Sequence, residues 1–246
     1  MQPTIQVFSD PQRLGDAAAE LIVEVLESAL ASRSRGAIAL SGGSTPRRLY
    51  AELGRHPWRE RIDWSRLHVF IVDERFVSPE DEQSNQRMMR ETLLATSPLP
   101  EENFHPMPFI PDDPERAALE YERELMAFFG RDSLPSLDLA LLGMGADGHT
   151  ASIFPGTRAV TIQDRWVAPT INPAGPSQRL TLTLPVINAA QTVAFLVAGS
   201  DKAETVRSII EDDAPQAFPA AHVAPKSGRL LWLLDEAAAV GLEGVG

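Results

Sequence analysis

The sequence predicts an α/β protein in which helices flank both faces of a mostly parallel sheet. Short apolar runs alternate with segments of helical periodicity along the chain, the pattern of successive βαβ units. Residues 137–142 (LDLALL) form an apolar run typical of a buried strand. The length of 246 residues suits one large α/β domain. We therefore expect a single domain over residues 1–246, to which a small second lobe could be attached.

Each predicted strand is a short apolar run between helical or turn-forming segments. In chain order, the strands are expected at Thr4–Phe8 and at residues 37–40, 67–72, 137–142, 180–184, 193–198 and 230–234.

The segment between the first two predicted strands has helical periodicity. Apolar residues recur at helical spacing from Leu14 to Leu30, while Asp10 and Pro11 stand where an N-cap and a first-turn proline belong. Further helices are expected at residues 46–53, 84–94, 114–129 and 202–210.

Two segments rich in proline separate these elements. Residues 96–114 hold six prolines and are expected to form an ordered surface connection, with a linker between two lobes as the alternative. Residues 169–178 form a Pro- and Gly-rich loop before Arg179 that could act as a lid.

Composition and charge restrict the classes of partner. The chain has 34 acidic and 22 basic residues, and its formal charge of -12 argues against nucleic acid or an anionic membrane as a partner. Cysteine is absent, which excludes disulfides and thiolate chemistry and fits a cytoplasmic protein. Neither a signal peptide nor a membrane-spanning run is found. We expect a cytoplasmic protein, a monomer or small homo-oligomer, whose partner is a small molecule.

A first candidate site is LSGGSTP, residues 40–46, between a predicted strand and a predicted helix. Glycines let backbone N–H groups crowd around an oxyanion, and a helix N-terminus adds partial positive charge. Ser41, Gly42, Gly43, Ser44 and Thr45 are therefore candidate phosphate ligands, with Thr45 expected as the N-cap. The spacing is not that of a Walker loop. The alternative is a tight strand-to-helix turn without a ligand.

Two further segments place charged residues after predicted strands. Asp73, Glu74 and Arg75 form the first, and such charges are often only a solvated loop. Lys202 lies in the first turn of a predicted helix, where the helix dipole disfavours a cation unless an anion is bound. Lys202 is therefore either a ligand residue or an ordinary surface lysine.

The segment LGMGADGHTASIFPG, residues 142–156, directly follows the predicted buried strand. Open α/β sheets bind ligands beyond the carboxyl ends of their strands, so Asp147 and His149 are expected to face a cleft. An imidazole can act as a general base, and a nearby carboxylate can orient it. The alternative is a structural histidine in a glycine-rich turn. The other four histidines lack metal-ligand spacing, and no metal site is expected.

The same segment matches the G-x-G-x-x-G pattern of dinucleotide sites through Gly143, Gly145 and Gly148. The stretch before Pro155 is too short for the long helix that such a motif opens, and Asp147 would stand beside the pyrophosphate. We therefore expect no cofactor.

Taken together, the motifs resemble the 6-phosphogluconolactonase family, which shares a fold with glucosamine-6-phosphate deaminase/isomerase. The match runs in order through SGGSTP, DERFV followed by Ser84 and Asn85, GMGADGHTASIFPG, RLTLTLP and GSDKAE. The resemblance implies a modified Rossmann-like fold of the deaminase type. It also implies hydrolysis of 6-phosphoglucono-δ-lactone to 6-phosphogluconate in the pentose phosphate pathway.

The resemblance further implies roles for the matched residues. His149 becomes the base that activates water, with Asp147 as its partner and Asp73 as a second acidic participant. The residues expected to bind the substrate or its phosphate are Ser41, Gly42, Gly43, Ser44, Thr45, Arg75, Arg179 and Lys202. A δ-lactone is an activated ester, so a general base and stabilisation of the oxyanion suffice without a covalent nucleophile. Ser152 lacks the setting of a nucleophilic serine and is expected to be a hydrogen-bonding loop residue.

Two alternatives come from other functional classes. A deaminase/isomerase carries a catalytic Glu after the DGH motif, whereas this chain has Ile153, Phe154 and Pro155 there. A non-catalytic sugar-phosphate sensor of this fold is expected to carry a DNA-binding helix-turn-helix, and the sequence has neither a basic patch nor a spare segment for one. Both observations favour the lactonase.

Overall fold

The computed structural model describes residues 3–131, 133–175, 177–212 and 217–243. At its centre lies a seven-stranded sheet in the order β1-β10-β9-β6-β2-β3-β5, in which every neighbouring pair is parallel. Its strands are β1 (Thr4–Phe8), β2 (Gly36–Leu40), β3 (Leu67–Ile71), β5 (Phe104–His105), β6 (Leu139–Leu142), β9 (Thr192–Val197) and β10 (Arg229–Asp235).

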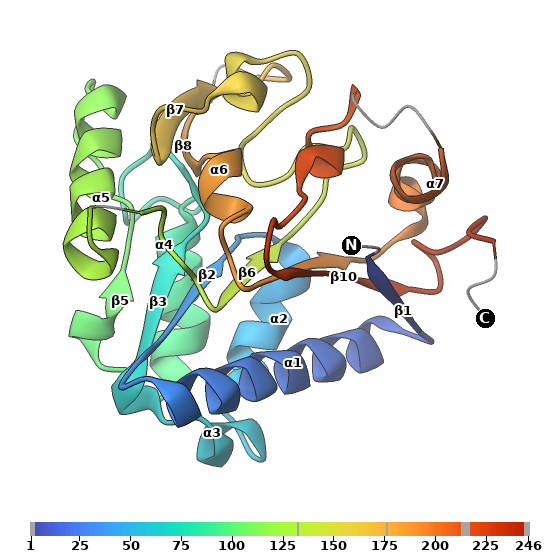
Figure 1. Cartoon of the computed structure of the whole chain (residues 1–246), viewed down its shortest axis with the longest axis horizontal. Helices are drawn as coiled ribbons and strands as arrows, with labels where there is room; N and C mark the ends of the chain where they lie inside the picture. The colour runs from blue at the N-terminus through green and yellow to red at the C-terminus, as the bar shows by residue number, and fades with distance from the viewer. Residues whose placement is uncertain (1–2, 132, 176, 213–216, 244–246) are drawn as a thin grey trace.

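Helices cover this sheet on both sides, which confirms the predicted fold class. They are α1 (Pro11–Ser32), α2 (Ser44–Leu53), α3 (Trp58–Arg61), α4 (Asn85–Met89), α5 (Pro114–Phe129), α6 (Leu184–Ile187) and α7 (Ala203–Glu211). Figure 1 shows α1 and α3 below the sheet and α6 and α7 above it. The connections β1–α1–β2 and β9–α7–β10 cross the sheet in opposite directions, so right-handed crossovers put their helices on opposite faces.

The central strands are apolar because both of their faces are covered. All residues of β2, β6 and β9 are buried. The first helix forms as predicted, since the Asp10 side chain accepts hydrogen bonds from the backbone N–H groups of Gln12 and Arg13. None of the helices in the described part of the chain is long and apolar enough to cross a membrane.

A second, smaller sheet carries the order β4-β8-β7, with β4 (Asp73–Arg75), β7 (Val167–Ile171) and β8 (Gln178–Leu182) all antiparallel to their neighbours. Val72 joins the two sheets: its N–H donates to the Leu40 carbonyl at 2.9 Å, and its carbonyl accepts from the Leu182 N–H at 2.8 Å. One hydrophobic cluster includes residues of both sheets. The small sheet is therefore fixed against the end of the large one.

The structure corrects the prediction for residues 180–184. They do not form a strand of the parallel sheet, because β8 ends at Leu182 in the small sheet and Leu184 begins α6. Pro185 has no N–H to continue a ladder, so the strand cannot extend through it.

Two strands lie in segments that were predicted as irregular. Pro169 belongs to β7, where a proline is tolerated because β7 is an edge strand, so the predicted loop at residues 169–178 is partly wrong. Residue 176 of that loop lies outside the described residues. Within residues 96–114, β5 pairs with β3, which makes this segment an ordered connection rather than a linker between lobes.

Candidate active site

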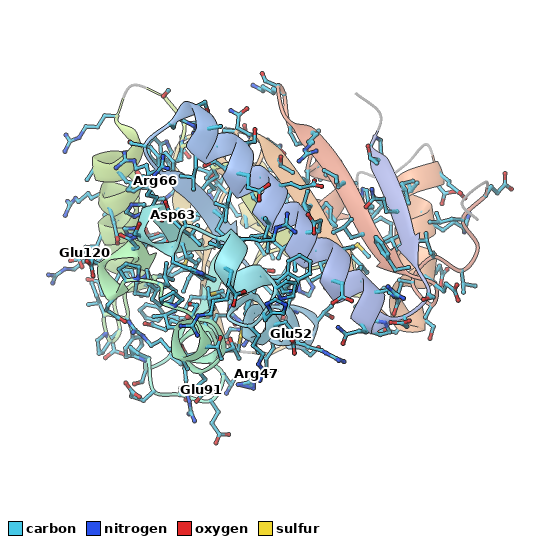
Figure 2. The ribbon with its side chains drawn as sticks, turned by 90° about the horizontal axis from the view of Figure 1, so that it is seen from below. Arg47, Glu52, Asp63, Arg66, Glu91 and Glu120 are labelled. Carbon is cyan, nitrogen blue, oxygen red and sulfur yellow. The ribbon has the colours of Figure 1, made fainter. Side chains whose placement is uncertain are left out.

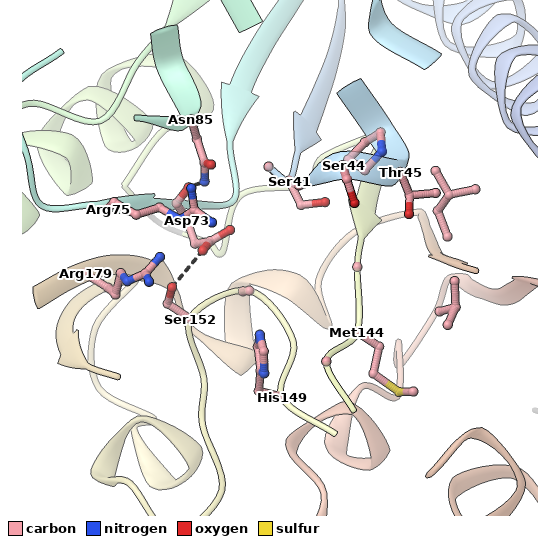
Figure 3. Close-up of a pocket in the computed structure, with 18 of the residues that line it drawn as sticks. Ser41, Ser44, Thr45, Asp73, Arg75, Asn85, Met144, His149, Ser152 and Arg179 are labelled. Carbon is pink, nitrogen blue, oxygen red and sulfur yellow. Dashed lines mark hydrogen bonds between the residues drawn. The ribbon is translucent and has the colours of Figure 1, made fainter. Parts of the chain in front are cut away.

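A cavity of about 430 Å³ lies between the carboxyl ends of the central strands and the small sheet (Figure 3). This volume is in the usual range for small-molecule sites. The predicted site residues that line it are Ser41, Gly42, Gly43, Ser44, Thr45, Asp73, Arg75, His149, Arg179 and Lys202. Asp147 is the exception, because it contacts His149 without lining the cavity.

The glycine loop between β2 and α2 forms one wall. Gly43 is the N-cap of α2 with φ 121°, so Thr45 is not the N-cap as predicted. Glycine adopts this conformation without strain and lets the helix begin at Ser44. A Cβ atom on Gly42 would lie 1.9 Å from Asn85 Oδ1, so any other residue there would displace the Asn85 side chain. No side chain among the described residues caps the helix, which leaves its first N–H groups available to an anion.

The pleat of β4 explains which of its three charged residues face the cavity. Side chains alternate along a strand, so Asp73 and Arg75 share one face and Glu74 points to the other. In the antiparallel ladder Asp73 lies opposite Thr181, and Arg75 lies opposite Arg179. The two arginines are therefore neighbours on the face that meets the cavity.

These two arginines have unused hydrogen-bonding capacity. Arg75 Nη1 donates to the Gln83 carbonyl at 2.6 Å, but Arg75 Nε and Arg179 Nε are buried without a partner in the described structure. Burial lowers the pKa of Arg179, and the adjacent charge of Arg75 lowers it further. Two guanidinium groups held side by side in this way form a site for an anion.

Arginines elsewhere on the molecule are paired differently. On the face seen in Figure 2, Arg47 Nη2 lies 2.9 Å from Glu91 Oε2, and Arg66 Nη1 lies 3.8 Å from Asp63 Oδ2. In a chain with a formal charge of -12, carboxylates to pair with arginine are abundant. Among the residues that are described, Arg75 and Arg179 form no such ion pair, and each has a buried Nε atom without a partner.

Glu74 has a structural role that the sequence did not reveal. Its carboxylate accepts hydrogen bonds from the backbone N–H groups of Arg75, Asn85 and Gln86 at 2.7 to 2.8 Å, and it thereby holds the first residues of α4. Burial raises the pKa of Glu74 to about 7. The alternative of a solvated loop is thus wrong for this strand, since Asp73 and Glu74 are both buried.

His149 and Asp147 form a close pair in the glycine-rich loop. His149 Nδ1 lies 2.5 Å from Asp147 Oδ1, which also accepts the His149 backbone N–H at 3.2 Å. A neutral imidazole carries one N–H, and with that proton on Nδ1, facing Asp147, Nε2 keeps a lone pair. Nε2 has no hydrogen-bond partner within the described chain, and the ring lines the cavity.

The loop leaves room for this ring because position 145 is a glycine. A Cβ atom on Gly145 would lie 2.2 Å from His149 Nδ1. The loop is closed by two backbone hydrogen bonds, from Gly148 N–H to the Gly145 carbonyl and from Gly145 N–H to the His149 carbonyl. On the other side of the ring, the Phe154 ring centroid lies 4.8 Å away. The imidazole is therefore held in one orientation.

Lys202 reaches the cavity from the segment before α7. It ends the short 3-10 turn Ser200–Lys202, and its Nζ donates to Asp201 Oδ2 at 2.8 Å. Thr205 Oγ1 donates to the Ala146 carbonyl at 2.6 Å, which ties α7 to the loop that carries His149. This bond fixes the position of Lys202, which directly precedes α7, relative to the His149 imidazole.

The sequence assigned no site role to three polar residues that line the cavity: Asn85, Ser152 and Asn172. Asn85 Nδ2 donates to the Asp73 carbonyl at 2.7 Å, and Ser152 Oγ donates to Asp73 Oδ2 at 2.7 Å. Asn85 and Ser152 both lie in the matched motifs, and this was the only feature of the sequence that pointed to a role in the site. Among the residues with described positions, no group of three or more histidines or carboxylates could hold a metal ion.

Comparisons with known proteins identify the family of this chain. The family model described as glucosamine-6-phosphate isomerases/6-phosphogluconolactonase matches residues 9–232. A 6-phosphogluconolactonase of Synechocystis sp. is 43% identical over 245 residues, covering 98% of this chain and 99% of the relative. The 6-phosphogluconolactonase of Homo sapiens is 41% identical over 239 residues, covering 96% and 92%. The solved 6-phosphogluconolactonase of Trypanosoma brucei superposes with a TM-score of 0.87 at 33% identity, covering 97% and 98%.

Proposed function

We propose that this chain, which belongs to the family of glucosamine-6-phosphate isomerases and 6-phosphogluconolactonases, hydrolyses 6-phospho-D-glucono-1,5-lactone to 6-phospho-D-gluconate. One observation carries the proposal: a single cavity holds three cationic side chains, an uncapped helix N-terminus and an imidazole with a free nitrogen. Cations and N–H groups suit the phosphate, and the imidazole suits the activation of water.

In the proposed reaction, His149 Nε2 takes a proton from a water molecule whose oxygen attacks C1 of the lactone. Asp147 stabilises the imidazolium that forms, because its carboxylate is already bound at Nδ1. The tetrahedral oxyanion then collapses, the bond between C1 and the ring oxygen breaks, and His149 returns its proton to that oxygen. The backbone N–H groups of the glycine loop and Arg179 are the candidate donors to the oxyanion.

The remaining lining residues serve binding in this proposal. Arg75, Arg179 and Lys202 hold the phosphate together with the loop of Ser41, Gly42, Gly43, Ser44 and Thr45. Asp73 acts as a second acidic participant that accepts hydrogen bonds from sugar hydroxyl groups, since only its Oδ2 is engaged by a side chain of the described structure. No step requires a cofactor.

The same observations weigh against deamination. Ile153 and Phe154, which stand where a deaminase carries its catalytic Glu, are buried apolar residues. Asp73 is the only carboxylate among the described residues that line the cavity. We place the lactone hydrolysis in the oxidative branch of the pentose phosphate pathway, in the cytoplasm, which fits the absence of cysteine.

The proposal is tested by generating the lactone in situ and following acid release. The purified protein should accelerate hydrolysis, and His149→Ala should reduce kcat by about 10² to 10⁴, the usual contribution of a general base. The same preparations should release no ammonia from glucosamine-6-phosphate. Equal rates for the wild type and His149→Ala would remove His149 from the mechanism, and phosphosugar binding without any acid release would indicate a sensor.

A further inference from the structure

The cavity contains a carboxylate close to two unpaired guanidinium groups. Asp73 and Arg75 are two residues apart on one face of β4, and Arg179 stands opposite Arg75. Diagonal neighbours on one face of a sheet are within reach of long side chains. Nevertheless, neither arginine forms an ion pair with Asp73, and the Nε atom of each has no partner in the described structure. Something must keep the carboxylate away from the arginines.

The contact that holds Asp73 comes from Ser152. The Ser152 hydroxyl donates to Asp73 Oδ2 at 2.7 Å, and no other side chain of the described structure donates to this carboxylate. Ser152 is itself 1% exposed, so water does not compete well for the hydrogen bond. Figure 3 shows this bond between Asp73 and Ser152, with the side chains of Arg75 and Arg179 nearby.

The backbone around Ser152 is built to aim this hydroxyl. Ala151 has φ 51°, a left-handed conformation that is disfavoured for a residue with a Cβ atom. The turn is closed by the Ile153 N–H, which donates to the Thr150 carbonyl at 2.9 Å. The Ser152 N–H donates to Thr181 Oγ1 at 3.2 Å. Ser152 is thus anchored to β8, the strand that carries Arg179.

We propose that Ser152 is a positioning residue that holds Asp73 away from Arg75 and Arg179, and thereby keeps the arginine pair open to the phosphate of the substrate. The identification of the anion as a substrate phosphate rests on the proposed function. Ser152 acts through Asp73 and touches no reacting atom. Without the Ser152 hydroxyl, the Asp73 carboxylate rotates toward Arg75 and Arg179. Its negative charge then neutralises the positive charge that would bind the phosphate.

The expected size of the effect follows from competition. When an internal carboxylate occupies the anion site for a fraction of the time, the apparent dissociation constant rises by the inverse of the remaining free fraction. If the released Asp73 occupies the arginines for about nine-tenths of the time, phosphate binding weakens about tenfold.

The test is a double-mutant cycle read out by calorimetric titration with inorganic phosphate, which needs no turnover. Ser152→Ala should weaken phosphate binding about tenfold. Asp73→Asn should not weaken it, since a neutral amide does not compete with the phosphate. In the Asp73→Asn background, Ser152→Ala should change the affinity less than about twofold, because the carboxylate to be held is gone. For Ser152→Ala alone, initial rates on the lactone should show the same loss as a raised KM.

A matched variant separates this role from a general loss of structure. Ser84 is also buried and donates to a carboxylate of β4, at 3.4 Å to Glu74 Oε2, but it does not line the cavity. Ser84→Ala should lower the melting temperature without weakening phosphate binding. An equal loss of affinity for Ser152→Ala with and without Asp73→Asn would overturn the proposal. Unchanged affinity in Ser152→Ala would also overturn it while leaving the lactonase proposal intact, whereas failure of the wild type to bind phosphate would reject the anion site itself.

Discussion

Two histidine–carboxylate pairs of the described structure, His149 with Asp147 and His105 with Glu124, differ in what surrounds the second ring nitrogen. His149 Nδ1 lies 2.5 Å from Asp147, and His105 Nδ1 lies 2.7 Å from Glu124. At His105 the other nitrogen is engaged as well, since Nε2 lies 3.0 Å from His68 Nδ1. At His149 the other nitrogen meets a cavity. A carboxylate beside a histidine is thus no sign of catalysis unless the opposite nitrogen is free.

The surroundings of the two pairs reinforce the contrast. The His105 ring stacks on Phe70 with centroids 4.2 Å apart, on the edge strand β5 and away from the described cavity. Its neighbours satisfy its polar atoms and pack against its faces, as a structural residue requires. Cations with unused donors line the cavity of His149. Among the described residues, polar atoms without a hydrogen-bond partner therefore lie near the His149 pair and not near the His105 pair.

The sharpest way to break this comparison is to move the His149 ring without replacing it. In Gly145→Ala the added methyl group would lie 2.2 Å from Nδ1, so the ring must shift. A misplacement of about 1 Å can cost about 10²-fold in rate, and we expect a loss of this order in kcat. Initial rates of acid release measure it.

Gly143→Ala is the matched control for this variant, because a Cβ atom at position 143 meets nothing within 4 Å. It should keep most of the turnover. Equal losses in the two variants would mean that the loop backbone matters, rather than the position of the imidazole.

A smaller effect is expected from the unpaired cations. Arg179→Ala removes a donor that we assign to the phosphate, so KM should rise about tenfold or more with a lesser change in kcat. Arg165→Ala is the control, since Arg165 Nη2 is also buried without a partner but the side chain is ion-paired to Glu115 outside this cavity. Identical saturation curves for Arg179→Ala and the wild type would contradict the assignment.

The smallest effect concerns the pH dependence of folding stability that comes from His68, the histidine in contact with His105. The pKa of His68 is lowered to about 4 by burial and by the charges of His105 and Arg35. In the unfolded chain this group titrates near 6.5, so the unfolded chain binds more protons between these values and stability falls as the pH falls through that window. Because the ring is partly exposed, the change should stay below about 1 kcal/mol.

Urea unfolding of His68→Asn at several pH values checks this prediction. The variant should show a weaker fall in stability toward low pH than the wild type. Glu74, whose pKa is raised to about 7, has the opposite dependence, and its contribution cancels because both proteins contain it. The exposed His56 provides the control, and a His56→Asn variant should follow the wild type. Parallel curves for His68→Asn and the wild type would show that the histidine contact does not affect stability.

Local signals predicted much of this molecule. The cap and periodicity of α1 and the apolar runs of the parallel strands are properties of neighbouring residues, and the corresponding elements form as expected. Loops that follow such strands meet at one edge of the sheet, which is why the motif residues converge on one cavity. Asp147 was placed in the cleft incorrectly, because spacing alone cannot tell which side of a loop a side chain occupies.

What could not be predicted depends on contacts between distant segments. Nothing near Asp73 in the sequence indicates that β4 pairs with β8, or that Ser152 reaches its carboxylate. The burial of Glu74 follows from the α4 backbone that it binds. The short strand β5 and the proline-containing β7 carry weak strand signals because both are edges.

The pairing of Arg75 with Arg179 in the β4–β8 ladder limits how the arginine pair can change during evolution. A shift of the ladder by a single residue would present Leu180 in place of Arg179 and exchange a charge for an aliphatic group. The separation of the two charges is therefore set in whole-residue steps by main-chain pairing. Gradual sequence drift in the surrounding side chains can alter the stability of this sheet while the distance between the charges is preserved.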